Sequence, residues 1–283
     1  MSKKISTLEL EERNEGKNLY SYQKGAIDKI FTAFEESPDD YHLLYQLPTG
    51  GGKTVIFSEI VRQYLKHHQK KVLVMTHRIE LCKQTSNMLT EFGVVNKVVD
   101  SKADLSDQAE YSCFVAMVET LNNRLNDDKL DISDIGLVII DEAHYNSFTK
   151  LFKFFSQSFI LGVTATPLSS SMELPMTDNY DELIVGESIE SLIENGFLAR
   201  AEMFSYNVGL TSLVVGANGD YTVKSSEDLY TANDMLTKLL QAYEERSKGK
   251  KTLIFNNGIN TSLHVYDTFR RAGYAVAHLD NTN

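Results

Sequence analysis

The sequence predicts an α/β fold in which helices cover both faces of a parallel β-sheet. Short apolar runs, typical of buried strands, alternate along the chain with longer stretches in which apolar residues recur at helical spacing. A glycine-rich turn joins one of these strands to a helix, and another strand ends in two adjacent acids. Within 283 residues, of which 42% are apolar and 24% are charged, we expect two globular domains.

The expected elements of the first domain follow in regular alternation. The first 18 residues carry few apolar side chains, which predicts a flexible arm over residues 1–18. Ser21 is expected to cap the first helix, and later helices are expected to stop at Gly93 and Gly196, because glycine favours the left-handed cap at a helix end. Strands are predicted at 41–46, 71–76, 94–99, 111–117, 136–140 and 159–164.

A second α/β unit is expected to start after the helix that stops at Gly196. The predicted elements are strands at 198–206, 251–255 and 274–279, an irregular hairpin at 207–224, and helices at 234–248 and 261–271. The predicted organisation is therefore an arm over 1–18, a first domain over 19–197 and the start of a second domain over 198–283.

Composition excludes several classes of protein. The formal net charge of −11 argues against attraction of nucleic acid to the whole surface, so such binding requires a local basic groove. The only two cysteines, Cys82 and Cys113, lie in apolar patterns, which predicts buried thiols and neither a disulfide framework nor a zinc site. No segment approaches the roughly 18 apolar residues that a membrane helix needs, so we expect a cytoplasmic protein without membrane contact.

The glycine-rich turn Leu47-Pro48-Thr49-Gly50-Gly51-Gly52-Lys53-Thr54 has the layout of a nucleoside-triphosphate site. The three glycines let the backbone approach phosphate oxygens, and the following helix directs its N–H groups at the same charge. Lys53 would reach the β- and γ-phosphates of ATP, and the Thr54 hydroxyl would bind Mg²⁺. The full pattern has glycine where this chain has Leu47, so the match is to the shorter Gly-x-Gly-Lys-Thr core; the alternative is a tight turn without a ligand.

The apolar strand at 136–140 runs directly into Asp141-Glu142-Ala143-His144. A carboxylate at the end of a buried parallel strand lies at the carboxyl edge of the sheet, which is where open α/β sheets bind ligands. We expect Asp141 to hold Mg²⁺ and Glu142 to polarise or deprotonate an attacking water molecule. The alternative for two acids after a strand is a helix cap.

In these motifs the chain resembles the superfamily 2 helicases and translocases, most of all their restriction-translocase and RadD-like group. Asp141-Glu142-Ala143-His144 resembles the DEAH box of this superfamily, and Thr164-Ala165-Thr166-Pro167 resembles the motif that couples hydrolysis to domain movement. The resemblance covers roughly residues 19–283. It implies a P-loop RecA-like domain followed by the start of a second one, ATP-driven movement on nucleic acid, and coupling roles for His144, Thr164 and Thr166.

The resemblance also implies contacts outside the triphosphate site. Gln23 occupies the place where such proteins read the nucleotide base, although a glutamine near a helix start is by default a surface residue. The segment 76–84, with His77, Arg78 and Gln84, resembles the one that grips the strand backbone. Thr120 belongs to the next strand-contacting segment, in which the family often has glutamine at the position of Glu119.

Three alternatives stay open at this stage. Duplex DNA is the first choice of track because of the subgroup resemblance, but RNA is the alternative within the same class of enzyme. A nucleotide-dependent binding switch that unwinds nothing is the alternative from another class, and the presence of Glu142 argues against it.

The family closes its ATP site with basic residues that follow the position of Asp280, so the resemblance implies a fragment that needs the rest of its own chain for efficient hydrolysis.

Overall fold

The structure is a computed structural model that describes residues 18–38, 40–103, 106–126, 131–168, 175–217 and 219–280. The chain divides into two compact units, Met1–Ala201 and Glu202–Asn283. The arm predicted over residues 1–18 lies, apart from its last residue, outside the described residues. In the described part of the chain, no helix combines the length and the apolar composition needed to cross a membrane.

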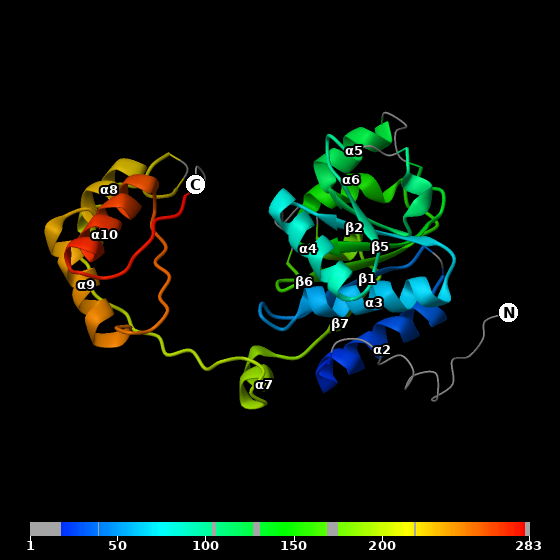
Figure 1. Cartoon of the computed structure of the whole chain (residues 1–283), viewed down its shortest axis with the longest axis horizontal. Helices are drawn as coiled ribbons and strands as arrows, with labels where there is room; N and C mark the ends of the chain where they lie inside the picture. Colours follow the sequence, from blue (N-terminus) through cyan, green and yellow to red (C-terminus); the bar gives the residue numbers. More distant parts are fainter. Residues whose placement is uncertain are drawn as a thin grey trace. The chain divides into compact units, whose positions relative to one another are not determined.

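The first unit is built on a seven-stranded parallel sheet with the order β3-β4-β2-β5-β6-β1-β7 (Figure 1). The strands are β1 (His42–Gln46), β2 (Lys71–Thr76), β3 (Asn96–Val99), β4 (Cys113–Met117), β5 (Ile135–Asp141), β6 (Phe159–Thr164) and β7 (Glu182–Val185). The six predicted strands are confirmed to within two residues at each end. The edge strand β7 was not predicted, because it is short and its side chains are mostly exposed.

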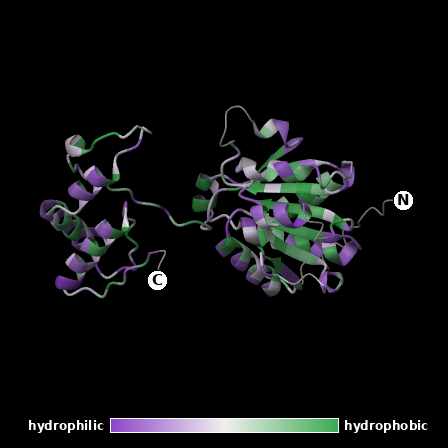
Figure 2. Ribbon diagram, turned by 90° about the horizontal axis from the view of Figure 1, so that it is seen from above, coloured by the Kyte–Doolittle hydropathy of each residue, from purple (hydrophilic) through white to green (hydrophobic). Residues whose placement is uncertain are grey.

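Helices cover both faces of this sheet, as the alternating pattern predicts (Figure 1). The covering helices are α2 (Ser21–Glu36), α3 (Lys53–His67), α4 (Ile79–Glu91), α5 (Val118–Asn126) and α6 (Thr149–Phe152), whereas α7 (Ile189–Glu194) contributes to neither core cluster. Short 3₁₀ turns, η1 (Gln108–Glu110), η2 (Asn146–Phe148) and η3 (Met176–Asp178), lie in the loops. The strands are the most hydrophobic segments of this unit (Figure 2).

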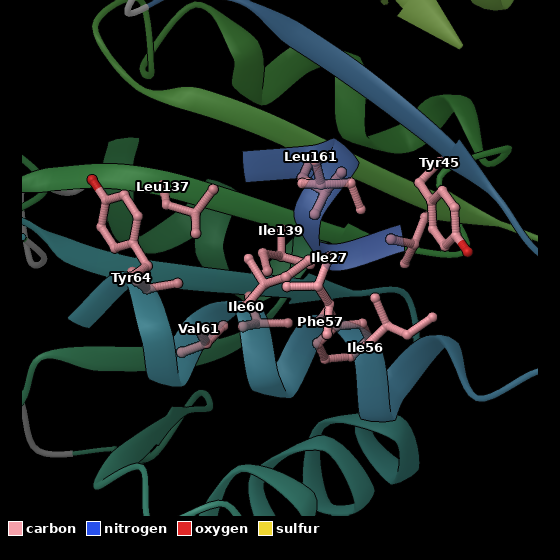
Figure 3. Close-up of a cluster of buried hydrophobic side chains, with 14 of the residues drawn as sticks. Ile27, Tyr45, Ile56, Phe57, Ile60, Val61, Tyr64, Leu137, Ile139 and Leu161 are labelled. Atoms are coloured by element: carbon pink, nitrogen blue, oxygen red, sulfur yellow. The ribbon is translucent and has the colours of Figure 1, made fainter. Parts of the chain in front are cut away.

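Two apolar clusters hold the layers together, one on each face of the sheet. Successive strand residues alternate between them: Leu43 and Tyr45 join the cluster beneath α2 and α3, whereas Leu44 joins the cluster beneath α5 and α6. Figure 3 shows the first cluster, in which Ile56 and Ile60 of α3 approach the strands. Because the helix period brings these isoleucines to one face, the helix is fixed over the sheet with its first residue, Lys53, at the end of β1.

The helix ends test the predicted caps. The prediction that Ser21 caps α2 is wrong: the cap is Tyr20, whose backbone N–H donates to Gln23 Oε1 at 3.0 Å, and Ser21 is the exposed first residue of the helix. The predicted stop at Gly93 is confirmed, with a φ of +74° that follows the end of α4 at Glu91.

The second unit contains α8 (Val223–Tyr230), α9 (Asn233–Arg246) and α10 (Ile259–Arg271), with a short turn η4 (Leu210–Ser212). Leu236, Val265 and Phe269 form its small core. Helices α9 and α10 confirm the predictions for 234–248 and 261–271. The hairpin predicted at 207–224 reduces to one antiparallel bridge between Val215 and Tyr221, and α8 begins inside the predicted range.

The strands predicted at 198–206, 251–255 and 274–279 are wrong as strands. The backbone there is not paired with another strand within the described residues of this unit, although 251–255 and 274–279 are apolar enough to pair. Leu253 and Phe255 are accordingly 72% and 89% exposed. Apolar runs become strands only when a hydrogen-bonding neighbour lies alongside. A second RecA-like domain over 198–283 therefore stays a prediction.

A close approach inside the first unit gives a test of the layered packing. A Cβ added to Gly162 of β6 would lie 2.6 Å from Oη of the buried Tyr180, so we expect Gly162→Ala to lower the free energy of unfolding by about 1–3 kcal/mol. Gly25, within α2, has nothing within 4 Å of its added Cβ, so Gly25→Ala is expected to raise the free energy of unfolding by roughly 0.5–1 kcal/mol. Urea titration followed by circular dichroism measures both; equal midpoints for the two variants would contradict the packing described.

Candidate nucleotide-binding site

The glycine-rich turn links the end of β1 to the start of α3 at the carboxyl edge of the sheet. Its entry is held by the Leu47 N–H, which donates to the Thr164 carbonyl of β6 at 2.9 Å. Gly50 and Gly52 both have a φ of +85°, the left-handed region that residues with a Cβ rarely adopt. The Gly52 carbonyl then accepts the Ile56 N–H at 3.0 Å, which begins the hydrogen bonding of α3. The backbone geometry of the turn therefore depends on glycine at these two positions.

Leu47, where the full triphosphate pattern has glycine, is fully buried. A Cβ added to Gly51 would lie 2.7 Å from Leu47 Cγ, and one added to Gly186 would lie 3.0 Å from Leu47 Cδ1. The leucine side chain thus fills the space left by two glycines, one within the turn and one after β7. Leu47 therefore has a packing role at the position where the full pattern has glycine.

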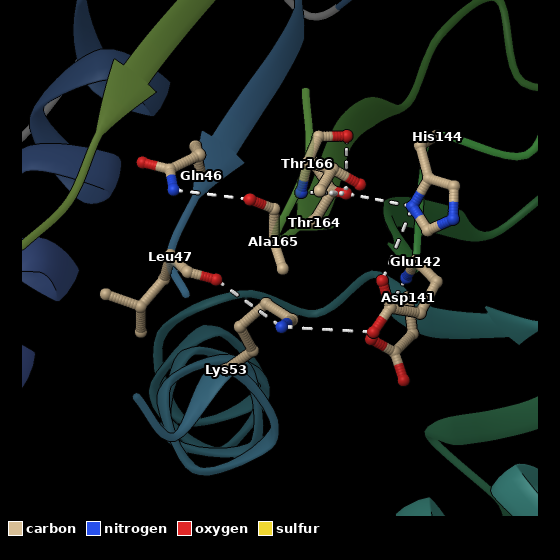
Figure 4. A network of polar contacts seen from close by, with 9 residues as sticks. All are labelled: Gln46, Leu47, Lys53, Asp141, Glu142, His144, Thr164, Ala165 and Thr166. Carbon is tan, nitrogen blue, oxygen red and sulfur yellow. Dashed lines mark hydrogen bonds and ion pairs between the residues drawn. The ribbon is translucent and has the colours of Figure 1, made fainter. Parts of the chain in front are cut away.

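Lys53 points from the first turn of α3 toward the end of β5 (Figure 4). Its side chain is only 9% exposed; Nζ donates to the Leu47 carbonyl at 3.4 Å and lies 3.8 Å from Glu142 Oε1. A buried ammonium group needs such partners because it has lost most of its hydration. The structure therefore brings the lysine of the glycine-rich turn and the acids after β5 to one rim of the sheet.

Asp141 is the last residue of β5 and is 7% exposed. Burial, followed by the charge of Glu142, raises the pKa of the Asp141 carboxyl to about 6, while Lys53 opposes this rise. Asp141 Oδ1 accepts the Glu142 N–H at 3.0 Å. Glu142 has a φ of +53°, and it is the only non-glycine residue with a positive φ in the described ranges.

A chain of polar contacts continues from Glu142 to the loop after β6 (Figure 4). His144 Nδ1 lies 3.4 Å from Glu142 Oε2 and 3.0 Å from Thr164 Oγ1. Thr164 Oγ1 in turn accepts the Thr166 N–H at 3.1 Å, and Gln46 Nε2 donates to the Ala165 carbonyl at 3.3 Å. The ends of β1, β5 and β6 are thereby connected through side chains. His144, Thr164 and Thr166, which were predicted to act together, are in contact.

Gln23 is 4% exposed and is not the surface residue that its position near a helix start suggests by default. Its Oε1 accepts the Tyr20 N–H, and its Nε2 faces the turn, because a Cβ added to Gly52 would lie 2.5 Å from it. The neighbouring Tyr22 hydroxyl donates to the Gly51 carbonyl at 2.7 Å. The start of α2 therefore contacts the glycine-rich turn.

Of the other predicted residues of the turn, Thr49 is exposed and Thr54 is half-buried in the first turn of α3.

The residues predicted to contact nucleic acid follow two adjacent strands, β2 and β4, at the same edge of the sheet. Arg78 and Gln84 are exposed, whereas His77 and Thr120 are half-buried. His77 Nδ1 is buried and has no hydrogen-bond partner among the described residues; burial and then the charge of Arg78 lower the pKa of this imidazole. The Nζ of Lys150 contacts both carboxylate oxygens of Glu119, the position at which the family often has glutamine, at 2.8 and 2.9 Å. The acid in this segment is thus paired with a lysine of α6.

Several contacts of the site could not be found from local sequence patterns. A Cβ on Gly50 would lie 2.8 Å from Leu198 Cδ2, and the Phe197 ring lies 4.6 Å from that of Tyr20 and 4.9 Å from that of Tyr22. The members of these pairs lie between 148 and 177 positions apart in the chain, and neither Phe197 nor Leu198 belongs to a motif. Only the fold brings them to the turn.

Comparison with known proteins agrees with this architecture. The family described as "Type III restriction enzyme, res subunit" matches residues 16–169, which is more than half of the chain. The "51.5 kDa protein" of a Lactococcus phage (isolate 7-9) is 28% identical over 241 residues, which cover 84% of this chain and 48% of that protein. The "Putative ATP-dependent helicase IRC3" of Saccharomyces cerevisiae is 27% identical over 285 residues, which cover 88% of this chain and 41% of that protein. The chain therefore spans about half the length of these two relatives or less.

A solved structure shows the same fold. It is a nuclease-deletion mutant of the type ISP restriction-modification enzyme LlaGI in complex with a DNA substrate mimic. The match has a TM-score of 0.50 and a sequence identity of 16%, and it covers 90% of this chain and 26% of that one. Taken with the family match and the geometry at the sheet edge, these comparisons confirm the resemblance found in the motifs. The chain belongs to the family of type III restriction enzyme res subunits, within the superfamily 2 helicases and translocases.

Proposed function

We propose that this chain is the ATP-binding part of a motor that couples hydrolysis of MgATP to movement on nucleic acid, with duplex DNA as the track. The observation that carries the proposal is the position of Lys53 Nζ, 3.8 Å from Glu142 Oε1 and beside the buried Asp141. A cation from a glycine-rich turn next to two carboxylates at a strand end is the arrangement that phosphoryl transfer requires.

The residues present fit both ATP and Mg²⁺. Glycine at three consecutive positions allows the left-handed backbone of the turn, and the N-terminus of α3 that follows favours negative charge such as that of phosphate. The Thr54 hydroxyl and the Asp141 carboxylate are hard oxygen donors, and Mg²⁺ commonly takes one or two protein ligands together with water and phosphate. When bound, the ion neutralises charge on the phosphates. Gln23, against Gly52, is in our proposal the residue that reads the nucleotide base.

The remaining roles follow from the contacts of Glu142. Its carboxylate is the proposed base that orients or deprotonates the attacking water, and Lys53 neutralises the phosphates. His144 holds the other oxygen of Glu142 and joins it to Thr164 and Thr166. We assign to these three residues the coupling between hydrolysis and movement of the two units.

Duplex DNA is proposed as the track for two reasons. The matching family is named after a restriction enzyme, and the related LlaGI enzyme was solved with a DNA substrate mimic. His77, Arg78, Gln84 and Thr120 are the proposed contacts to the strand backbone. Arg78 is the exposed cation among them, and the ion pair of Glu119 with Lys150 reduces repulsion of phosphate at this edge.

Substitutions at the two charged partners separate binding from turnover. We expect Lys53→Ala to abolish ATP binding, because the ammonium that faces the phosphates is lost, and Glu142→Gln to retain binding but to stop hydrolysis in the full-length protein. Titration with a fluorescent ATP analogue and a phosphate-release assay measure the two effects. Lys66→Ala, an exposed lysine near the other end of α3, is the matched control. Unchanged nucleotide affinity in Lys53→Ala would remove the basis of the assignment.

The raised pKa of Asp141 predicts how binding of the cation depends on pH. Because this carboxyl has a pKa of about 6, protons compete with Mg²⁺ below that pH, and the Mg²⁺ affinity rises as the pH increases through it. Between pH 7 and pH 5 we expect the Mg²⁺ concentration for half-maximal nucleotide binding to rise by about tenfold from this group. Asp141→Asn, which cannot titrate there, should show only the pH dependence of the nucleotide itself. Identical profiles for the two proteins would contradict a role of Asp141 in holding the ion.

The choice of track is tested on the full-length protein with equal nucleotide concentrations of single-stranded DNA, duplex DNA and RNA. We expect duplex DNA to raise the ATPase rate severalfold, since strand contacts at the sheet edge complete the site. Stimulation by RNA to the same extent would overturn the choice of DNA. If the protein binds ATP but does not hydrolyse it in all three conditions, the result would instead support the nucleotide-dependent switch.

A further inference from the structure

Tyr145, which follows the acids and His144, lies between two histidines from different loops. Its ring centroid is 4.3 Å from that of His77 and 4.3 Å from that of His144, with interplanar angles of 33° and 36°. His77 follows β2 and belongs to the proposed strand-contacting segment 76–84, whereas His144 follows β5. Three rings in contact therefore span the carboxyl ends of two adjacent strands.

At one end of this stack, His144 contacts Glu142, the residue that we propose acts on water. His144 Nδ1 lies 3.4 Å from Glu142 Oε2 and 3.0 Å from Thr164 Oγ1. The Tyr145 N–H also donates to the Glu142 carbonyl at 3.2 Å, so Tyr145 is fixed to the same left-handed turn. A displacement of the Tyr145 ring therefore reaches Glu142 through both the side chain of His144 and the backbone.

At the other end of the stack, the His77 ring contacts Tyr145. His77 Nδ1 is buried without a hydrogen-bond partner among the described residues. Burial and the adjacent Arg78 lower the pKa of His77, which favours a neutral ring that makes no ion pair. Ring–ring contact with Tyr145 therefore helps to orient this imidazole, and Arg78 next to it is exposed at the proposed nucleic-acid edge.

We propose that Tyr145 is a positioning residue that couples nucleic-acid contact at the segment 76–84 to the orientation of Glu142. The inference rests on the proposed function and adds a second connection to the one through Thr164 and Thr166. Tyr145 is 36% exposed, so it is not a core residue on which folding of the sheet depends. Its part is to transmit a change in the position of His77 to His144.

The coupling is measured as linkage between two ligands in the full-length protein. The affinity for a labelled DNA duplex is determined by fluorescence anisotropy with and without a non-hydrolysable ATP analogue, and the ratio of the two affinities is compared among variants. For Tyr145→Ala we expect the ratio to move toward one by about two- to tenfold, the amount that one aromatic contact provides. Tyr145→Phe keeps the ring and should retain the wild-type ratio.

A double-mutant cycle identifies the partner. If the ring contact carries the coupling, Tyr145→Ala introduced into a His77→Ala background should change the ratio no further. Tyr145→Leu, which keeps most of the volume but not the ring, replaces Tyr145→Ala if the alanine variant does not fold. A fully retained ratio in the folded alanine or leucine variant would overturn the inference alone. A wild-type protein whose DNA affinity does not respond to the analogue would overturn the proposed function, and this inference with it.

Discussion

The site depends on one electrostatic constraint: three charged groups from two distant segments lie together at one rim of the sheet. Lys53 and Asp141 are almost fully buried, and Glu142 lies within ion-pair distance of the lysine. Charges in such surroundings are tolerable only in the presence of opposite charge and hydrogen bonds. The lysine opposes the rise in pKa that burial and Glu142 impose on Asp141, so the ionisation of Asp141 depends on both neighbours. The chemistry proposed for this rim therefore depends on the three groups being held together.

This constraint is met because the backbone is held on both sides of the rim. The Leu47 N–H is anchored to β6, the Gly186 N–H donates to the Gln46 carbonyl at 2.8 Å, and the Leu47 side chain fills the space beside Gly51 and Gly186. The glycine-rich turn is thus supported by three neighbouring strands, β1, β6 and β7. Its shape is a property of the sheet and not of the turn sequence alone.

Local sequence predicted the parts of the structure that local sequence determines. Buried parallel strands are near-continuous apolar runs, so six of the seven strands of the first unit could be located, and the turn and the acid pair were identified because each is a contiguous motif. The Tyr20 cap depends on a side chain three residues away, and the edge strand β7 lacks buried residues. Contacts such as Lys150 with Glu119, Leu198 with Gly50 and Tyr145 with His77 arise only from tertiary placement. In the second unit, apolar pattern alone predicted strands that have no partner in the described residues.

The left-handed backbone of Glu142 is a conformation that disfavours glutamate, although the proposed chemistry needs its carboxylate. Glycine and asparagine occupy this region of backbone space more readily than glutamate does, and the penalty for another residue is on the order of 1 kcal/mol. The chain carries a carboxylate where its own geometry favours a smaller residue. Selection for thermal stability alone would therefore favour replacement of Glu142. The resulting protein would be more stable but would lack the group that we expect to activate water.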